Sequence, residues 1–311
     1  MPPSAFTADV AAAVRLASAP PLLRLLDRLR FTGQSSVSQR PGTTPVARAT
    51  QASGLELAAH KPYTPGDDLR HVDWNALARL DQRVVKTFRA EREAPLHLLL
   101  DTSASMGAPT ADAKLAFGAA LAACCAYIAL RHGNPVRAAA LTAGNDGSRL
   151  SPLLRHPHRL PELYGFLAPL SAAGTTRLRE GVDAYLRSTQ LPGLVIVISD
   201  FLVDPSHAER AFDQLRGRGH DVVALRPLGA LERDAAHLPR RVRLRDAESG
   251  LQRDVELSAA HRARYAAAMA AHVAHLRDWC AGRGIAFAAV DPAAGLSDCL
   301  LHALPRAGVL Q

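Results

Sequence analysis

The sequence predicts an α/β fold, a doubly wound and mainly parallel sheet of the Rossmann type, with an inserted β-hairpin and an N-terminal helical/β extension. Short apolar runs alternate with helix-length segments from residue 96 onward, as in successive βαβ units. The runs at 96–100 and 194–199 are rich in Leu, Val and Ile, which is typical of parallel strands buried on both faces. The chain of 311 residues is long enough for one such domain with appendages.

Residues 1–53 predict an N-terminal helix followed by a flexible linker. The leucines between Leu22 and Leu29 form an apolar stripe beside charged residues, which favours a helix. Residues 32–54 are rich in Gly, Ser, Thr, Gln and Pro, a composition typical of linkers. The charged segment that follows shows one strand pattern, over 84–88. The predicted parts of the chain are 1–53, 54–93 and 94–311.

Within the main domain, each predicted element follows from a local pattern. The segment 111–131 is apolar on most sides, so we expect a well-buried helix. Turn residues at 142–147 and 246–250 predict two hairpins, of which the second is the insertion. Gly217 and Gly219 supply a helix C-cap. The predicted strands are 96–100, 136–141, 148–154, 194–199, 221–225, 241–245, 251–257 and 285–290, and the predicted helices are 111–131, 157–168, 178–189, 206–217, 258–282 and 296–304.

Composition excludes several classes of protein. Hydrophobic residues at 48% and charged residues at 21% are ordinary globular values, which exclude wholesale disorder and collagen-like repeats. The net charge of +8 is spread along the chain, so we expect no specific nucleic-acid partner. The four cysteines, Cys124, Cys125, Cys280 and Cys299, form no CxxC pair, and we expect free thiols in a reducing compartment.

We expect neither a targeting signal nor a membrane span. The N-terminus lacks the basic-then-apolar order of a secretory signal. The longest uncharged apolar run, Leu115–Leu130, is shorter than the roughly 20 residues that cross a bilayer. We interpret this run as a buried helix and expect a cytoplasmic protein.

Acidic residues end two of the predicted strands, at Asp101 and Asp200. In open α/β sheets, ligands bind beyond the carboxyl ends of the strands, where the strand order reverses. Asp101 begins the run Asp-Thr-Ser-Ala-Ser, so a carboxylate and the hydroxyls of Ser103 and Ser105 recur at alternate positions. Oxygen ligands of this kind suit Mg²⁺.

A further hydroxyl is available from Thr175 or Thr176, which follow Gly174 just before the predicted helix 178–189. Each of these features also has a purely structural interpretation. Asp101, Asp200 and the Gly174–Thr176 turn can each act as helix N-caps. Their occurrence together at matching strand-to-helix junctions favours a metal site.

The arrangement resembles the metal-ion-dependent adhesion site of von Willebrand factor A domains. The family pattern is Asp-x-Ser-x-Ser, a distant Thr in a Gly-Thr loop, and a distant Asp after a later strand. Thr176 matches this Thr better than Thr175, because Leu178 falls where the family has an apolar residue. The similarity covers roughly residues 94–311. It implies that Mg²⁺, with Mn²⁺ or Ca²⁺ as alternatives, is held by Asp101, Ser103, Ser105, Thr176 and Asp200.

A second resemblance begins before the main domain. The segment Tyr63–Arg79, followed by residues 84–93 and the Asp-x-Ser-x-Ser turn, is similar to the bacterial "domain of unknown function 58" proteins. These proteins resemble von Willebrand A domains and are typically encoded beside MoxR-type AAA+ ATPases, which are therefore the implied partner. The hairpin around 246–250 also fits this family. Longer members of this family carry membrane spans near the N-terminus. We expect no such span in this sequence, so the chain resembles the short soluble type.

The segment Tyr63–Arg79 also has local explanations. Asp67 or Asp68 is expected to cap a helix over 74–80. We interpret Trp74 as a core anchor of this segment. The alternative is a role in partner recognition for Arg70, Asp73, Trp74 and Arg79.

Other chemical signals are weak. Ser103 replaces the second acid of Asp-x-Asp phosphotransferases, which removes the general acid/base. His272 and His275 lie three apart on a predicted helix without the Glu or Cys that a zinc set requires. A basic run precedes the predicted turn at 246–250 and consists of Arg240, Arg241, Arg243 and Arg245. We interpret this run as the solvated face of a strand, with a binding role as the alternative.

The sequence therefore favours a non-catalytic, metal-dependent protein–protein interaction module in which a partner's Glu or Asp carboxylate completes the metal's coordination. The family resemblance implies a MoxR-type AAA+ ATPase as partner, in chaperone-like assembly or maturation of protein complexes. One alternative is a metal-dependent phosphoesterase that uses the same cluster. The last alternative is a nucleic-acid binder, which would show steep salt dependence.

Overall fold

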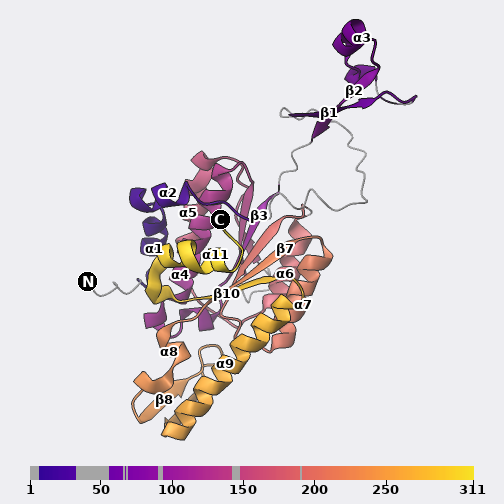
Figure 1. Ribbon diagram of the computed structural model, residues 1–311. Coiled ribbons are helices and arrows are strands. Elements are labelled where there is room, and N and C mark those ends of the chain that lie inside the picture. Colours follow the sequence, from indigo (N-terminus) through magenta and orange to yellow (C-terminus); the bar gives the residue numbers. More distant parts are fainter. Residues whose placement is uncertain are drawn as a thin grey trace. The chain divides into compact units, whose positions relative to one another are not determined.

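The computed structural model divides the chain into two units, Met1–Val37 with Ala94–Gln311, and Ser38–Glu93 (Figure 1). It describes residues 7–32, 56–65, 67, 69–89, 94–141, 148–189 and 191–311. Nearly all of the predicted linker 32–54 and the predicted turn 142–147 lie outside these residues.

A six-stranded sheet forms the centre of the larger unit. Its strand order is β10-β7-β6-β3-β4-β5, and all neighbours are parallel except β4 and β5. The predicted doubly wound, mainly parallel sheet is therefore confirmed. The strands are β3 (Leu96–Asp101), β4 (Val136–Leu141), β5 (Ser148–Leu150), β6 (Leu194–Ile198), β7 (Asp221–Pro227) and β10 (Ala286–Val290).

Helices cover both faces of this sheet because the side chains of each buried strand alternate between two cores. In β3, Leu98 and Leu100 face one core and Leu99 faces the other. The first core contains residues of α1 (Val10–Ala17), α2 (Pro20–Leu26), α4 (Lys114–Arg131), α5 (Leu160–Leu167), α10 (Gly295–Asp298) and α11 (Leu304–Arg306). The second contains residues of α6 (Leu178–Ser188), α7 (Pro205–Gly217) and α9 (Ala259–Ala281).

Helix α4 is the most buried helix of the first core. The segment Thr110–Arg131 is long and apolar enough to cross a membrane by length and composition, but 94% of its apolar window is buried inside the protein. A core helix with neighbours on all sides has the same composition. The sequence interpretation of Leu115–Leu130 as a buried helix is confirmed.

The N-terminal segment forms two short helices instead of one. Pro20 and Pro21 occupy the first turn of α2, a position that proline favours, and they separate it from α1. Asp9 caps α1 by accepting a hydrogen bond from the Ala11 amide (2.9 Å). The segment then pairs with the end of the chain, because Phe31 forms a β-bridge with Leu310.

Two other predicted elements are shorter or more irregular than expected. β5 ends at Leu150, and Leu154 forms only an isolated bridge with Val136. The predicted helix 296–304 is α10 and α11 separated by a π-helical segment, Cys299–Ala303. A π-helical turn contains one more residue than an α-helical turn, and no local pattern in this sequence predicts such a turn.

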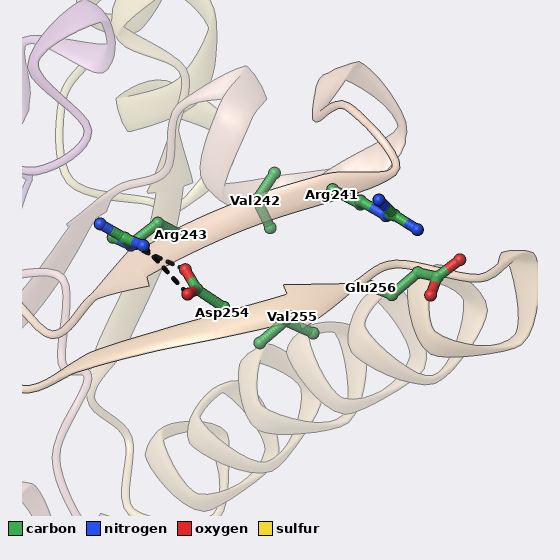
Figure 2. A pocket seen from close by; sticks show the side chains of 6 residues that line it. All are labelled: Arg241, Val242, Arg243, Asp254, Val255 and Glu256. Carbon is green, nitrogen blue, oxygen red and sulfur yellow. Dashed lines mark hydrogen bonds and ion pairs between the residues drawn. The ribbon is translucent and has the colours of Figure 1, made fainter.

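The predicted inserted hairpin is present as β8 (Arg241–Arg245) and β9 (Gln252–Glu256). Figure 2 shows Val242 opposite Val255, and the Arg243 guanidinium paired with both carboxylate oxygens of Asp254 (2.7 and 3.0 Å). The arginines of β8 are exposed, which confirms the solvated strand face. A hollow of about 530 Å³ is lined by Arg241, Val242, Arg243, Asp254, Val255 and Glu256.

The smaller unit contains a strand that the sequence did not predict. This strand, β1 (Glu56–Pro62), pairs antiparallel with β2 (Val84–Arg89), which covers the predicted strand 84–88. Helix α3 (Trp74–Leu80) matches the predicted range.

The predicted cap of α3 was wrong. Asp73 is the N-cap, and its Oδ1 accepts hydrogen bonds from the Asn75 amide (3.0 Å) and the Ala76 amide (3.1 Å). Asp67 instead accepts hydrogen bonds from Thr64. The other candidate, Asp68, lies outside the described residues.

The interpretation of Trp74 as a core anchor was also wrong, since this side chain is 61% exposed. Trp74 begins α3, and none of the seven residues of this helix is buried, so the helix offers no core for the Trp74 side chain to anchor.

Candidate functional site

The strand order of the sheet reverses between β3 and β6. β3 continues to β4 on one side, and β6 continues to β7 on the other, so the crevice between their carboxyl ends is the expected ligand position. Asp101 is the last residue of β3, and Asp200 follows β6 by two residues. Because β3 and β6 are parallel neighbours, both carboxylates lie at the same edge of the sheet.

The turn after β3 brings three of the predicted residues together. Asp101 Oδ1 accepts a hydrogen bond from the Ser103 amide (2.9 Å), which closes the turn. The Ser103 and Ser105 hydroxyls are 3.0 Å apart. Asp101 and Ser103 are each 2% exposed, and Ser105 is partly exposed. The alternation of polar residues in the sequence therefore produces a cluster of oxygen atoms.

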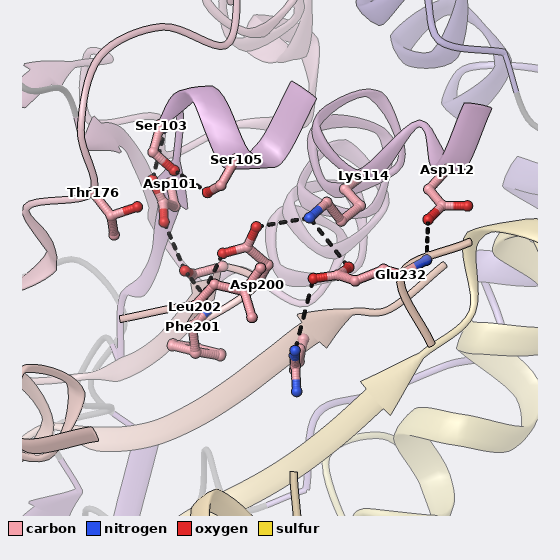
Figure 3. Close-up of polar contacts among 12 residues, drawn as sticks. Asp101, Ser103, Ser105, Asp112, Lys114, Thr176, Asp200, Phe201, Leu202 and Glu232 are labelled. Atoms are coloured by element: carbon pink, nitrogen blue, oxygen red, sulfur yellow. Dashed lines mark hydrogen bonds and ion pairs between the residues drawn. The ribbon is translucent and has the colours of Figure 1, made fainter. Parts of the chain in front are cut away.

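Two main-chain hydrogen bonds place the threonine loop beside this turn. The Ala173 amide donates to the Thr102 carbonyl, and the Ala104 amide donates to the Gly174 carbonyl (2.9 Å each). Gly174 adopts φ +75°, which glycine accommodates without strain. Thr175 is exposed, whereas Thr176 is partly buried, and Figure 3 shows the Thr176 hydroxyl pointing toward Asp101.

Asp200 is fully buried and paired with a lysine. Its Oδ2 lies 2.8 Å from Lys114 Nζ, and its Oδ1 accepts a hydrogen bond from the Leu202 amide (3.2 Å). Phe201 between them adopts φ +50°, an uncommon conformation for a bulky side chain. His272 Nε2 lies 2.9 Å from the Phe201 carbonyl oxygen. The main chain after β6 is therefore held from both sides.

Ser199 connects the two acidic strand ends and was not predicted as a site residue. Its hydroxyl donates to Asp101 Oδ2 (2.7 Å) and accepts from the Phe201 amide (3.0 Å). This serine is the residue before Asp200, at the end of the strand run. A hydroxyl in that position was the one sequence signal that could have identified it.

Sequence reasoning also missed a buried ionic network behind Asp200 (Figure 3). Lys114 Nζ lies 3.2 Å from Glu232 Oε2, and an Arg226 nitrogen lies 3.8 Å from Glu232 Oε1. Asp112 accepts hydrogen bonds from the Leu231 and Glu232 amides at 3.3 and 3.1 Å. A lysine that begins an otherwise apolar helix, and an arginine within an apolar strand, were the available signals.

The buried charges leave the site with a deficit of cations. Burial, with a further contribution from the charge of Asp200, raises the pKa of Asp101 to about 6. Burial also raises the pKa of Glu232. In the described part of the chain, four buried carboxyl groups belong to this site and the network behind it, Asp101, Asp112, Asp200 and Glu232, and two buried cations do, Lys114 and Arg226. A divalent cation would correct this imbalance.

The donor atoms suit a hard divalent cation. Carboxylate and hydroxyl oxygens are the ligands that Mg²⁺ and Ca²⁺ prefer in proteins. The Ser103 and Ser105 hydroxyls are hydrogen-bonded to each other at 3.0 Å, a separation that the adjacent ligands of either ion can adopt. Among the described residues, no group of three or more His, Cys, Asp or Glu side chains could hold a metal. A cation here would thus depend on hydroxyls as well as carboxylates.

The remaining sequence candidates have contacts of their own or belong to the other unit. His275 Nε2 pairs with Glu209 Oε1 (3.0 Å) while His272 contacts the Phe201 carbonyl, so the two histidines bind separate groups. The signature residues Arg70, Asp73, Trp74 and Arg79 belong to the smaller unit.

Comparison with known proteins supports the family resemblance. Residues 59–275 match the family model described as "Protein of unknown function DUF58". Uncharacterized protein Rv1480 of Mycobacterium tuberculosis is 31% identical over 222 residues, which are 70% of this chain and 69% of that protein. Uncharacterized protein Mb1516 of Mycobacterium bovis gives the same values.

Similar solved structures are more distant. An aerotolerance-related membrane protein from Bacteroides fragilis is 16% identical, with a TM-score of 0.40, over 68% of this chain and 99% of that one. A von Willebrand factor type A protein from Catenulispora acidiphila is 19% identical, with a TM-score of 0.32, over 46% of this chain and 34% of that one. The match to the pilus adhesin SpaC of Lactobacillus rhamnosus GG (13% identical, TM-score 0.35) spans 50% of this chain and 27% of the adhesin. On the family model and the mycobacterial relatives, the chain belongs to the DUF58 family of proteins of unknown function.

Proposed function

We propose that this protein is a non-catalytic, metal-dependent protein–protein interaction module. One observation carries the proposal. The turn after β3, the threonine loop and the end of β6 place hard oxygen ligands at one edge of the sheet, where the described residues put one lysine, Lys114, in contact with Asp200. The residues that would hold the ion, directly or through water, are Asp101, Ser103, Ser105, Thr176 and Asp200.

Mg²⁺ is the proposed ion, with Mn²⁺ and Ca²⁺ as alternatives. The small hydroxyl ligands in this set favour Mg²⁺. Only two of the five residues carry a carboxylate, and Asp200 already shares its charge with Lys114. The ion would therefore keep positive character that an acidic side chain of a partner can satisfy.

The cluster offers little to catalysis. In the described part of the chain, the Ser103 and Ser105 hydroxyls hydrogen-bond to each other and not to a general base. The Thr176 hydroxyl donates a hydrogen bond to the Glu248 carboxylate. The pairing of the two serine hydroxyls with each other supports binding in preference to nucleophilic chemistry.

The proposed partner is a MoxR-type AAA+ ATPase, in the cytoplasm, in a chaperone-like role in the assembly or maturation of protein complexes. DUF58 membership supports this choice, because proteins of this type are typically encoded beside such ATPases. The proposal assigns the ATPase, or the client that it remodels, the acidic side chain that reaches the metal.

Two measurements test the proposal. Calorimetric titration with Mg²⁺ should show one site that Asp101→Ala abolishes. Binding to a purified MoxR-type ATPase from the same organism, followed by biolayer interferometry, should be lost with EDTA and in Asp101→Ala. Equal binding under all conditions would remove the metal from the mechanism. Mg²⁺-dependent hydrolysis of a generic phosphoester, lost in Asp101→Asn, would instead support the phosphoesterase alternative.

A further inference from the structure

The inserted hairpin brings a carboxylate to the candidate metal site. Glu248 lies in the turn between β8 and β9, far from Thr176 in the sequence. Its Oε1 accepts hydrogen bonds from the Thr176 hydroxyl (2.5 Å) and the Thr176 amide (3.1 Å). Glu248 is partly buried, whereas Ala247 and Ser249 on either side are exposed. The tip of the hairpin is therefore in contact with a proposed metal ligand.

The turn holds this glutamate in place by its own hydrogen bonds. Asp246 Oδ1 accepts from the Glu248 amide (3.1 Å), the Ser249 amide (2.6 Å) and the Ser249 hydroxyl (2.7 Å). Gly250 closes the turn at φ +72°, and its amide donates to the Asp246 carbonyl (3.0 Å). The main chain at Glu248 is therefore ordered by contacts within the turn, and the carboxylate itself is left to contact Thr176.

The contact is a hydrogen bond that brings a carboxylate within one ligand spacing of a proposed metal-binding hydroxyl. Adjacent oxygen ligands of Mg²⁺ lie about 2.9 Å apart and these two oxygens are 2.5 Å apart, so both can contact one ion once the Thr176 hydroxyl turns its hydrogen away from Glu248. A carboxylate is also the chemical group that the proposed function assigns to the partner. Glu248 thus supplies, from within the same chain, a carboxylate in contact with Thr176.

We infer that Glu248 is a built-in carboxylate ligand of the metal site, and that the hairpin and an acidic partner compete for one coordination position. This inference rests on the proposed metal-dependent function. The hairpin then acts as an autoinhibitory element, and a partner binds only when its own carboxylate displaces Glu248.

A purely structural role for Glu248 predicts something different. The Thr176 amide lies just before α6, where a carboxylate can cap the helix, and capping alone would leave the metal unaffected. The two roles are distinguished by counting the water molecules on the bound ion. Mn²⁺ serves as the probe, because its unpaired electrons accelerate the relaxation of exchanging water protons.

The experiment uses the full chain loaded with Mn²⁺ alone, in four forms. These are the wild type, Glu248→Ala, Glu256→Ala and Asp101→Ala. Glu256 is the matched control, because it is a glutamate of the same hairpin that pairs with Arg240 in an exposed position. The measured quantities are the Mn²⁺ dissociation constant and the water-proton relaxivity per bound ion.

Glu248→Ala should admit one more water, which raises relaxivity roughly 1.5- to 2-fold for an ion that keeps one or two waters in the wild type. Its Mn²⁺ affinity should fall about tenfold or more. Glu256→Ala should match the wild type in both quantities. Unchanged relaxivity and affinity in Glu248→Ala would overturn the inference and leave the metal site standing, provided that Asp101→Ala still loses Mn²⁺. If the wild type fails to bind Mn²⁺, the proposed metal-dependent function and this inference are both wrong.

Discussion

Lys114 is the residue that connects the acidic site to the core of the protein. Its ammonium group lies 2.8 Å from Asp200 and 3.2 Å from Glu232, and all three side chains are at most 4% exposed. Replacing it removes the cation paired with Asp200 and leaves Glu232 with Arg226, 3.8 Å away. We expect Lys114→Met to lower the free energy of unfolding by about 3–5 kcal/mol, measured by urea denaturation.

Arg131 at the other end of α4 is the matched control. It pairs with Asp27 through side chains that are 53% and 40% exposed, so Arg131→Met should cost no more than about 1 kcal/mol. Similar losses in the two variants would show that Lys114 contributes no more than a surface charge.

Asp101 gives the protein a pH dependence that has an unusual sign for an aspartate. Its pKa of about 6 in the folded protein exceeds that of an unfolded aspartate, mainly because the side chain is buried and also because Asp200 is close. The folded state therefore keeps a proton that the unfolded state has released. In metal-free buffer, this group should lower the free energy of unfolding by about 2 kcal/mol as the pH rises from 4 to 7.5.

The measurement is a series of urea denaturation curves between pH 4 and pH 7.5. Asp101→Asn is uncharged at every pH, so this variant should lack that part of the decline. The same pH profile in wild type and variant would mean that Asp101 has an ordinary pKa.

At the residue scale, the sequence predicted the candidate ligands but not their supports. Asp101, Ser103 and Ser105 lie within one turn, so their spacing is a local pattern. The contacts of Lys114 with Asp200, Ser199 with Asp101 and Glu248 with Thr176 join residues 86, 98 and 72 positions apart. Such pairs come together only in the folded chain, so no local pattern in the sequence predicts them.

At the scale of elements, Gly107 sets how closely the threonine loop approaches the turn after β3. A Cβ atom at this position would lie 2.7 Å from the Cβ of Ala172, closer than side chains pack. We expect Gly107→Ala to push the loop away, to cost about 1–3 kcal/mol and to weaken Mn²⁺ binding.

Gly165 in α5 is the control, because a Cβ there meets nothing within 4 Å. Gly165→Ala should be neutral or stabilising by up to about 1 kcal/mol, since alanine favours helix, and should leave Mn²⁺ binding unchanged. Calorimetry on the two variants measures both effects. Equal Mn²⁺ affinity in both would show that the position of the loop is unimportant.

Strongly patterned elements were predicted and irregular ones were not. The continuous apolar runs of β3 and β6 are short and rich in Leu, Val and Ile, whereas that of α4 is long, so length and residue type distinguish strand from helix. β1 was missed because the run Glu-Leu-Ala-Ala-His-Lys-Pro lacks alternation and contains residues that strands disfavour. Its formation depends on the pairing with β2, which is not a local property.

At the scale of the whole molecule, the cysteines report on the integrity of the larger unit. All four are free and buried, in agreement with the expectation from the sequence. Burial raises the pKa of Cys280 and of Cys299 to about 12. At pH 8 only about one thiol in 10⁴ of this kind is ionised.

We therefore expect none of the four cysteines to react with Ellman's reagent in the native protein and all four to react in urea. The reaction is followed by absorbance. Any slow reaction under native conditions should be no faster than unfolding of the protein. Fast labelling of Cys124 or Cys299 without unfolding would show that α4 separates from the C-terminal segment on its own.

The pairing of Phe31 with Leu310, and of Arg30 with Gln311 through main-chain hydrogen bonds, has a consequence for biosynthesis. Residues 30 and 31 are synthesised about 280 residues before their partners, so the N-terminal helices of the larger unit complete their packing only after residues 310 and 311 have been made.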